Sequence, residues 1–173
     1  MKNITIILFI ILIIFLALFF NYKNNKIIET NVLNNNDKDK ILNDDSFKLY
    51  DHTILYVNNN EISLYIADNN LKKQKGLMNV NELKDDEGMI FLFNEQNKHT
   101  FWMKNTLIPL DIIWVDKDKT IVDIITAQPC TSESCPFLYP KAESMYVIEL
   151  QAGNSDKNNI NIGDKLNFDI KIK

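Results

Sequence analysis

The 173-residue sequence contains no arginine, and it has only four glycines, four prolines, two cysteines and two histidines. Arginine most often clamps phosphates and reads base edges, and the net charge is −4, so nucleic acid is not an expected partner. Four glycines are too few to build a phosphate-cradling loop, and neither a GxSxG elbow nor an HExxH zinc motif is present. No common enzyme template fits the chain, and we expect no cofactor.

The amino-terminal segment is strongly apolar. Residues 4–20 read ITIILFIILIIFLALFF, without a charge, an amide or a proline, which is near the lower limit for a membrane-spanning helix. A cleaved signal peptide is the alternative, but the exit ALFFNYK offers no small-x-small cleavage site. We therefore expect an uncleaved signal anchor over residues 1–22 and a single-pass membrane protein. The lysines on the two sides of the run do not decide its orientation.

Two further regions follow the apolar run. Residues 23–46 are rich in Asn, Asp and Lys and have no sustained period, which predicts a flexible tether. Residues 47–173 have the size and composition of one ordinary globular domain.

The globular region has the pattern of short β-strands, dense in β-branched and aromatic residues and separated by polar turns. The strands are expected at residues 52–57, 61–67, 88–93, 100–103, 110–115, 120–126, 144–150 and 166–172. One short helix is expected in DNNLKKQKGLM, with Asp68 or Asn69 as its cap and Gly76 as its end. The pattern predicts a mainly β domain with a compact antiparallel sandwich or barrel.

Several short motifs occur along residues 67–164. They are GLM at 76–78, GMIF at 88–91, FWMKNTLIPLDIIW at 101–114, PC and CP within 129–136, YVIEL at 146–150 before Ala152–Gly153, and Gly163–Asp164. In this order the motifs resemble the domain of unknown function 192 family. The resemblance implies a β-rich domain like a jelly roll, often carried behind a signal or anchor segment, and no established reaction. Family members usually have a basic residue shortly after GLM, where this chain has Asn79 and Val80.

Some residues within these motifs are expected to be structural anchors. The candidates are Gly76, Gly88, Glu149, Gly163 and Asp164. Glu149 also fits the outward position of an alternating strand, and we prefer both of these interpretations to a role in acid–base catalysis.

Polar side chains interrupt the apolar segment at residues 101–114. If residues 100–103 and 110–115 form adjacent strands, Trp102 and Lys104 share one face. Asp111 then lies among apolar residues, and a buried carboxylate needs a cation or several hydrogen-bond donors. Lys104 and Asn105, across the turn, are the expected partners of Asp111.

Two interpretations of this segment stay open, and both concern the same polar residues, namely Lys104, Asn105, Thr106 and Asp111. In the first, Asp111 accepts hydrogen bonds from the backbone of the connection, the amide and hydroxyl residues make the turn, and the lysine is solvated. In the second, they form the polar rim of an aromatic pocket, floored by Trp102 or Trp114, that binds a small polar or anionic ligand.

Cys130 and Cys135 lie in the proline-rich loop QPCTSESCPFLYP. Four intervening residues can close a small disulfide ring, which would order the loop. Zinc would need two more ligands, and His52 and His99 are remote in sequence, so no metal is expected. A disulfide is the favoured interpretation. Because disulfides persist outside the reducing cytosol, it favours an extracytoplasmic domain.

Three functional hypotheses follow. The favoured one is a membrane-tethered extracytoplasmic binding or accessory domain, whose polar rim engages a small polar ligand or an envelope protein. The second is an enzyme that uses Lys104 and Asp111 as a polar pair, which requires a concave site holding both. The third is a structural envelope module, which requires a flat, exposed apolar patch without converging polar groups.

Overall fold

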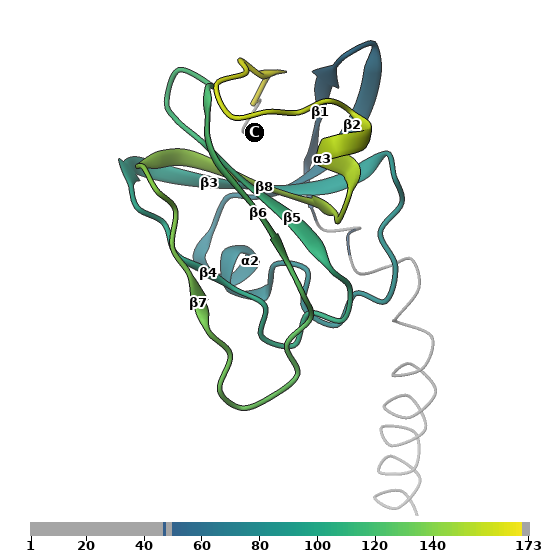
Figure 1. Ribbon diagram of the computed structural model, residues 1–173, viewed down its shortest axis with the longest axis vertical. Coiled ribbons are helices and arrows are strands. Elements are labelled where there is room, and N and C mark those ends of the chain that lie inside the picture. The colour runs from purple at the N-terminus through teal and green to yellow at the C-terminus, as the bar shows by residue number, and fades with distance from the viewer. Residues whose placement is uncertain (1–46, 48–49, 171–173) are drawn as a thin grey trace, which may run out of the picture. The chain divides into compact units, whose positions relative to one another are not determined.

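The computed structural model describes residues 47 and 50–170, and Figure 1 shows the arrangement of their strands and helices. The strands are β1 (His52–Val57), β2 (Asn60–Ala67), β3 (Glu87–Asn97), β4 (Phe101–Trp102), β5 (Leu110–Val115), β6 (Ile121–Ala127), β7 (Phe137–Leu138), β8 (Ser144–Gln151) and β9 (Asn167–Phe168). The helices are α2 (Asn70–Lys75) and α3 (Asn154–Lys157). The prediction of a mainly β domain is confirmed.

Seven strands form one sheet in the order β6-β5-β8-β3-β2-β1-β9, and β4 and β7 form a separate two-stranded sheet. The prediction of antiparallel pairing throughout is wrong at one place, because β2 and β3 are parallel. Parallel neighbours need a long crossover connection, and residues 68–86, which include α2, supply it.

The large sheet curls until residues near its two edges meet. Ile121, at the start of β6, donates its N–H to the Asp164 carbonyl at 2.9 Å and accepts from the Gly163 N–H at 2.8 Å. The chain then continues into β9, which pairs with β1. Gly163 has φ of +94°, a conformation that glycine adopts without strain. The large sheet is therefore a single curled layer, not the two facing sheets of a sandwich.

Both faces of the curled sheet are covered by apolar side chains. Along β5, Ile113 and Val115 belong to the core inside the curl, whereas Leu110, Ile112 and Trp114 belong to a second core on its outer face. The alternation follows from the period of two along a strand. Figure 1 shows α2, β4 and β7 on one side of the sheet and the carboxy-terminal segment on the other.

Helix α2 has the boundaries that its sequence predicts. The Asn69 side chain accepts a hydrogen bond from the Lys72 N–H at 3.0 Å, and Gly76 ends the helix with φ of +46°. Helix α3 was not predicted, because four residues give no helical period to detect.

Gly88 lies where the chain packs too tightly for a side chain. A Cβ atom added there would lie 2.6 Å from Leu150 Cδ2 and 2.8 Å from Leu64 Cδ2, distances that real Cβ atoms do not show. Only glycine therefore fits this position of β3 without displacing its neighbours.

Residues 100–103 and 110–115 do not form adjacent strands, so the condition under which Lys104 and Asn105 were expected to reach Asp111 is not met. Strand β4 pairs with β7, and β5 lies between β6 and β8. The reason is that the backbone after β4 turns away to pair with Cys130, through bridges from Lys104 and Thr106.

The predicted signal anchor at residues 1–22 and most of the predicted tether at residues 23–46 lie outside the described residues. Within residues 50–170, no helix is long and apolar enough to cross a membrane.

Candidate functional site

Asp111 is buried on β5 and is fully occupied with hydrogen bonds. Its Oδ1 accepts from the Thr126 hydroxyl at 2.7 Å, and its Oδ2 accepts from the Gly153 and Ser155 N–H groups, each at 2.9 Å. The Asp111 carboxylate thus connects β5 to the Thr126 side chain on β6 and to the backbone at the start of α3.

Lys104 and Asn105 are not the partners of Asp111, so this expectation is wrong. Asp111 shares its face of β5 with Ile113 and Val115, which point into the curl. Lys104 follows β4, next to the outer core that contains Met103. The sheet therefore separates the lysine from the aspartate.

The turn at residues 104–106 is held by backbone hydrogen bonds. Asn105 has φ of +56°, donates its N–H to the Cys130 carbonyl at 2.9 Å and accepts from the Asn79 N–H at 2.9 Å. Thr106 is buried and donates its N–H to the Met103 carbonyl at 3.1 Å. The turn is thereby fixed between the loop after GLM and the loop that carries the cysteines.

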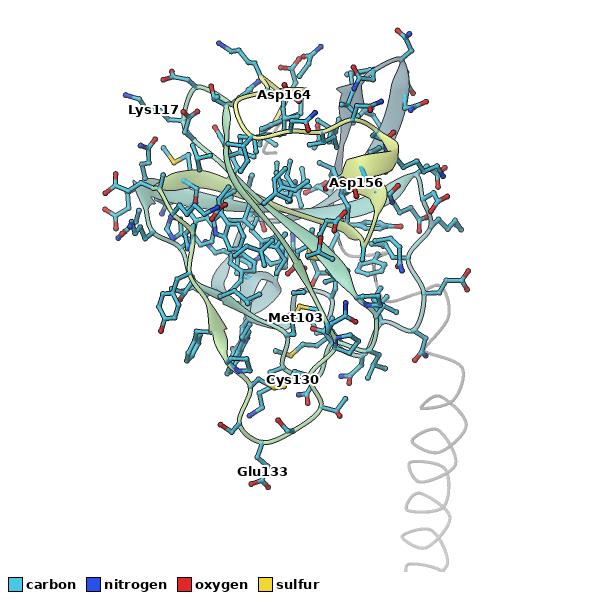
Figure 2. All side chains as sticks on the ribbon, in the orientation of Figure 1. Met103, Lys117, Cys130, Glu133, Asp156 and Asp164 are labelled. Carbon is cyan, nitrogen blue, oxygen red and sulfur yellow. A yellow bond between two sulfur atoms is a disulfide. The ribbon has the colours of Figure 1, made fainter. Side chains whose placement is uncertain are left out.

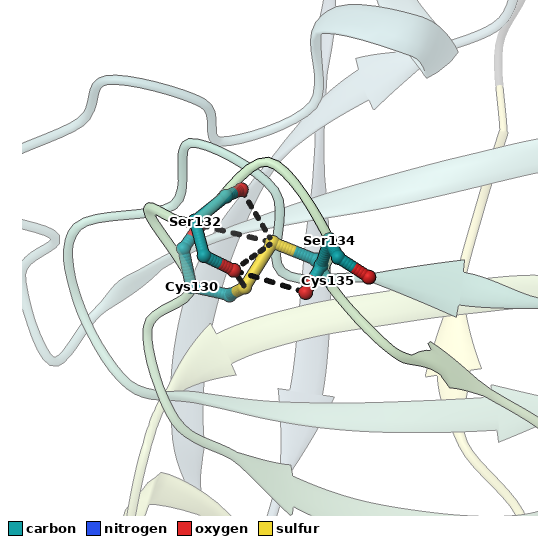
Figure 3. The surroundings of a disulfide bond; sticks show 4 residues. All are labelled: Cys130, Ser132, Ser134 and Cys135. Carbon is teal, nitrogen blue, oxygen red and sulfur yellow. Dashed lines mark hydrogen bonds between the residues drawn. A yellow bond between two sulfur atoms is a disulfide. The ribbon is translucent and has the colours of Figure 1, made fainter.

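Cys130 and Cys135 form the predicted disulfide, with sulfur atoms 2.05 Å apart. Figure 3 shows Ser132 beside the bond, with its hydroxyl 3.4 Å from the Cys130 sulfur. The same hydroxyl donates to the Ser134 carbonyl at 2.9 Å. The bond closes the loop next to the Cys130 carbonyl that holds the Asn105 turn, so it also supports that turn.

Trp102 and Lys104 lie on the same side of the turn. The Lys104 ammonium is 5.5 Å from the centre of the Trp102 ring, and that ring stacks on Phe137 of β7 at 5.5 Å with an interplanar angle of 3°. Trp102 is 37% exposed. The other tryptophan, Trp114, is buried and donates its indole N–H to the His99 carbonyl at 2.7 Å. Of the two tryptophans, Trp102 is therefore the one available to a ligand.

A hollow of about 420 Å³ lies between α2 and the Lys104 turn, and we name it the Lys104 basin. Its lining residues are Leu71, Gln74, Lys75, Met78, Trp102, Lys104 and Asn105. The α2 contribution was missed from the sequence. The GLM motif, which begins at the end of this helix, was the available signal.

A smaller hollow of about 30 Å³ adjoins the basin, and we name it the Glu149 cleft. The two hollows share the lining residues Gln74, Lys75, Met78, Trp102 and Lys104. The cleft alone also reaches Thr106 and Glu149. The basin and the cleft together form the candidate site.

Glu149 is 5% exposed, so its interpretation as an outward strand residue is wrong. It lies on β8 between Met89 of β3 and Ile112 of β5, beneath the outer core. Within the described part of the chain, its Oε2 atom has no hydrogen-bond partner. A buried carboxyl in that position lowers stability, which makes it a candidate functional group.

Burial raises the pKa of Glu149 to about 8, so the carboxyl is mostly protonated at neutral pH. Three lysines also line the cleft. Lys73 is engaged, because its ammonium donates to the Leu92 carbonyl at 3.0 Å and lies 5.0 Å from the Phe93 ring centre. Lys75 and Lys104 make no ion pair with any described residue. The candidate site thus combines a neutral acid with two available cations.

The remaining candidate residues lie elsewhere. Gly163 and Asp164 are at the closure of the sheet. Gly76 ends α2. A Cβ atom added to Gly76 would lie 3.4 Å from the Phe91 ring. Across residues 50–170, no three His, Cys, Asp or Glu side chains are arranged to hold a metal ion.

The fold and the hollow define a small β-rich domain, built on one curled sheet, with a pocket on the outer face of that sheet. The chain belongs to the DUF192 family, whose model, described as "Uncharacterized ACR", matches residues 53–168. The resemblance inferred from the motifs is thus confirmed, and the function of this family is unknown.

Archaeal relatives named UPF0127 protein match the chain. The one from Thermococcus sibiricus is 30% identical over 114 residues, which cover 61% of this chain and 66% of that protein. The one from Pyrococcus abyssi is 31% identical over 108 residues, which cover 60% of this chain and 83% of that protein. The match thus spans slightly less than two thirds of the T. sibiricus protein.

Solved bacterial structures also match. A Sinorhizobium meliloti 1021 protein, described as a proposed transcription regulator, has a TM-score of 0.60 and 30% identity, covering 69% of this chain and 95% of that one. A protein of unknown function from Novosphingobium aromaticivorans has a TM-score of 0.57 and 33% identity, covering 68% of this chain and 84% of that one.

The separation of Lys104 from Asp111 can be tested with a double-mutant cycle. Asp111→Asn should cost about 2 kcal/mol of unfolding free energy, because buried N–H donors lose their charged acceptor. Lys104→Ala should cost less than about 1 kcal/mol, the value of an exposed cation–π contact. The two effects should add within about 0.5 kcal/mol in urea unfolding. A coupling energy well above this value would show that the two side chains interact after all.

The burial of Glu149 predicts a distinct pH dependence of stability. Its folded-state pKa of about 8 exceeds the ordinary value of 4.5, so between these values the native state binds more protons than the unfolded state. Stability should therefore fall as the pH rises from about 5 to about 8, by a few kcal/mol. Urea unfolding at about pH 5 and about pH 8 measures this loss of stability. The loss should disappear in Glu149→Gln, whereas it should persist in Glu143→Gln, where the substituted residue is exposed. Parallel pH profiles of Glu149→Gln and the parent would contradict the assignment.

Proposed function

We propose that the domain is a binding module that recognises a small polar ligand in the Lys104 basin, with Glu149 as the deepest contact. The single observation that carries the proposal is the buried Glu149 carboxyl in the cleft beside the basin, whose Oε2 has no hydrogen-bond partner among the described residues. Ligand pockets of proteins span about 300–1,000 Å³, and the basin lies within this range.

The energetic argument concerns what position 149 would hold if only the fold mattered. An apolar side chain between Met89 and Ile112 would complete the outer core and avoid the desolvation of a carboxyl. Functional sites commonly contain a residue that breaks the pattern of the core without a compensating contact. A ligand in the cleft would supply the missing hydrogen-bond partner.

The other two hypotheses have less support. An enzyme that uses Lys104 with Asp111 needs both in one concave site, yet they line different hollows. A structural module needs a flat apolar patch, whereas the basin brings Lys75, Lys104 and Trp102 together. The exposed aromatic residues Phe137 and Tyr139 follow the disulfide loop and would enlarge the contact surface for a ligand or an envelope protein.

We further propose that residues 4–20 anchor the domain to a membrane and that the domain lies outside the cytoplasm. The disulfide between Cys130 and Cys135 supports this location, because such bonds persist outside the reducing cytosol. The S. meliloti relative is described as a proposed transcription regulator, but DNA binding depends on basic surface charge. This chain has no arginine and a net charge of −4, so we do not extend that role to it.

The location can be tested by protease protection. In cells that express the full chain with a carboxy-terminal tag, protease added to intact protoplasts should remove the tag, because the domain is exposed outside the membrane. A cytoplasmic marker should stay intact until detergent is added. Protection of the tag together with that marker would place the domain in the cytoplasm and reject the proposed location.

Ligand binding can be tested on the full chain in mild detergent by ligand-observed NMR. The panel contains amino acids, short carboxylic acids, amines, sugars and nucleosides. At least one class should bind the parent and the Lys117→Ala control, and should bind Lys104→Ala at least about tenfold more weakly, because one charged contact is lost. Lys117 suits the control because Figure 2 shows it across the sheet from Met103. If no class binds, or if Lys104→Ala binds like the parent, the proposal fails.

A further inference from the structure

We infer that the Lys104 basin binds a small carboxylate, with the two carboxylate oxygens in the Glu149 cleft beside Lys104 and Thr106. The inference rests on the proposed function, because it names the chemical class of the ligand of the same site. Three observations support it: the donors that line the cleft, the size of the cleft and the apolar wall of the basin.

The polar side chains that line the cleft are mainly hydrogen-bond donors. Lys104 offers an ammonium group and Thr106 a hydroxyl, and Lys75 adds a second cation at the entrance shared with the basin. Glu149 is the only acidic side chain among the lining residues. A carboxylate accepts hydrogen bonds and donates none, so it is complementary to such a lining.

Glu149 fits this arrangement as a protonated acid. Burial raises its pKa to about 8, so at neutral pH its hydroxyl can donate to an anion. Hydrogen bonds from O–H groups to carboxylates are short and stronger than those between neutral groups. The charged groups that line the cleft together with Glu149 are Lys73 and Lys75 from α2 and Lys104 from the turn, whereas its neighbours on β3 and β5, Met89 and Ile112, are apolar.

The dimensions of the cleft favour a planar group with two oxygens. Its volume of about 30 Å³ admits roughly two water-sized atoms. A phosphate or sulfate carries four oxygens in a tetrahedral arrangement, and the cleft has room for only about two of them. The rest of the ligand would lie in the basin against Trp102, Met78 and Leu71, a wall that suits an apolar or aromatic body.

The ligand class can be tested with three probes of similar shape, namely benzoate, benzamide and benzylamine. Calorimetry on the full chain in mild detergent should show that benzoate binds about 10- to 100-fold more tightly than benzamide, and that benzylamine binds most weakly. Lys104→Ala should lose this preference for benzoate, whereas Lys117→Ala should keep it. Acetate and propionate serve as smaller carboxylate probes if the ring of benzoate does not fit.

The pH dependence adds a readout that a purely structural role of Glu149 would not change. As the pH rises from about 6.5 to about 9, Glu149 loses its proton, so the parent should bind benzoate more weakly because a donor is replaced by a like charge. Near pH 8, binding should take up protons, which makes the heat depend on the ionisation enthalpy of the buffer. The amide in Glu149→Gln keeps a donor, so its affinity should stay constant over this range.

Each other result has a definite meaning. Tighter binding of benzylamine than of benzoate, abolished in Glu149→Gln, would overturn the inference and support a cationic ligand in the same basin. The inference would also be overturned if the affinity for benzoate changed neither in Lys104→Ala nor with pH. If no carboxylate binds but a sugar or nucleoside binds in a Lys104-dependent manner, only the inference fails. If no probe or panel member binds, the proposed function fails with it.

Discussion

The burial of both faces of one curled sheet is the constraint on which the rest of the structure depends. Because side chains alternate along each strand, every residue of β5 and most of β8 must enter either the core inside the curl or the core on the outer face. A polar residue on these strands cannot reach solvent by pointing to the other face. Two acidic residues, Asp111 and Glu149, are subject to this constraint, and they meet it in opposite ways.

Asp111 and Glu149 lie on neighbouring strands but face opposite sides of the sheet. Asp111 enters the inner side near α3, where backbone N–H groups and the Thr126 hydroxyl satisfy its oxygens. Glu149 enters the outer side, where its cross-strand neighbours are Met89 and Ile112 and no donor from the described residues reaches Oε2. The hydrogen bonds of Asp111 explain its presence by the fold alone, whereas the fold does not explain Glu149.

Local patterns in the sequence predicted the local structure well. The β-rich runs, the Asn69 cap, the Gly76 end of α2, the disulfide and the family were all found, because each depends on neighbouring residues or on a motif. The alternation of side chains along a strand also predicted that Trp102 and Lys104 lie on the same face, as they do. The closure of the sheet, the parallel β2–β3 pair and the partners of Asp111 depend on contacts between distant segments, so they could not be read from the sequence. The burial of Glu149 depends in the same way on α2 and the Lys104 turn.

The site also bears on the departure of this chain from its family. The resemblance of the motifs to the family implies a basic residue shortly after GLM, and this chain has Asn79 there, whose N–H donates to the Asn105 carbonyl at the edge of the basin. The position after GLM therefore lies beside the basin, so a basic side chain there would add positive charge close to it. In this chain Lys75 and Lys104 already supply two cations at the same place. The absence of the basic residue after GLM is thus compatible with an anionic ligand, because the charge comes from α2 and from the turn after β4.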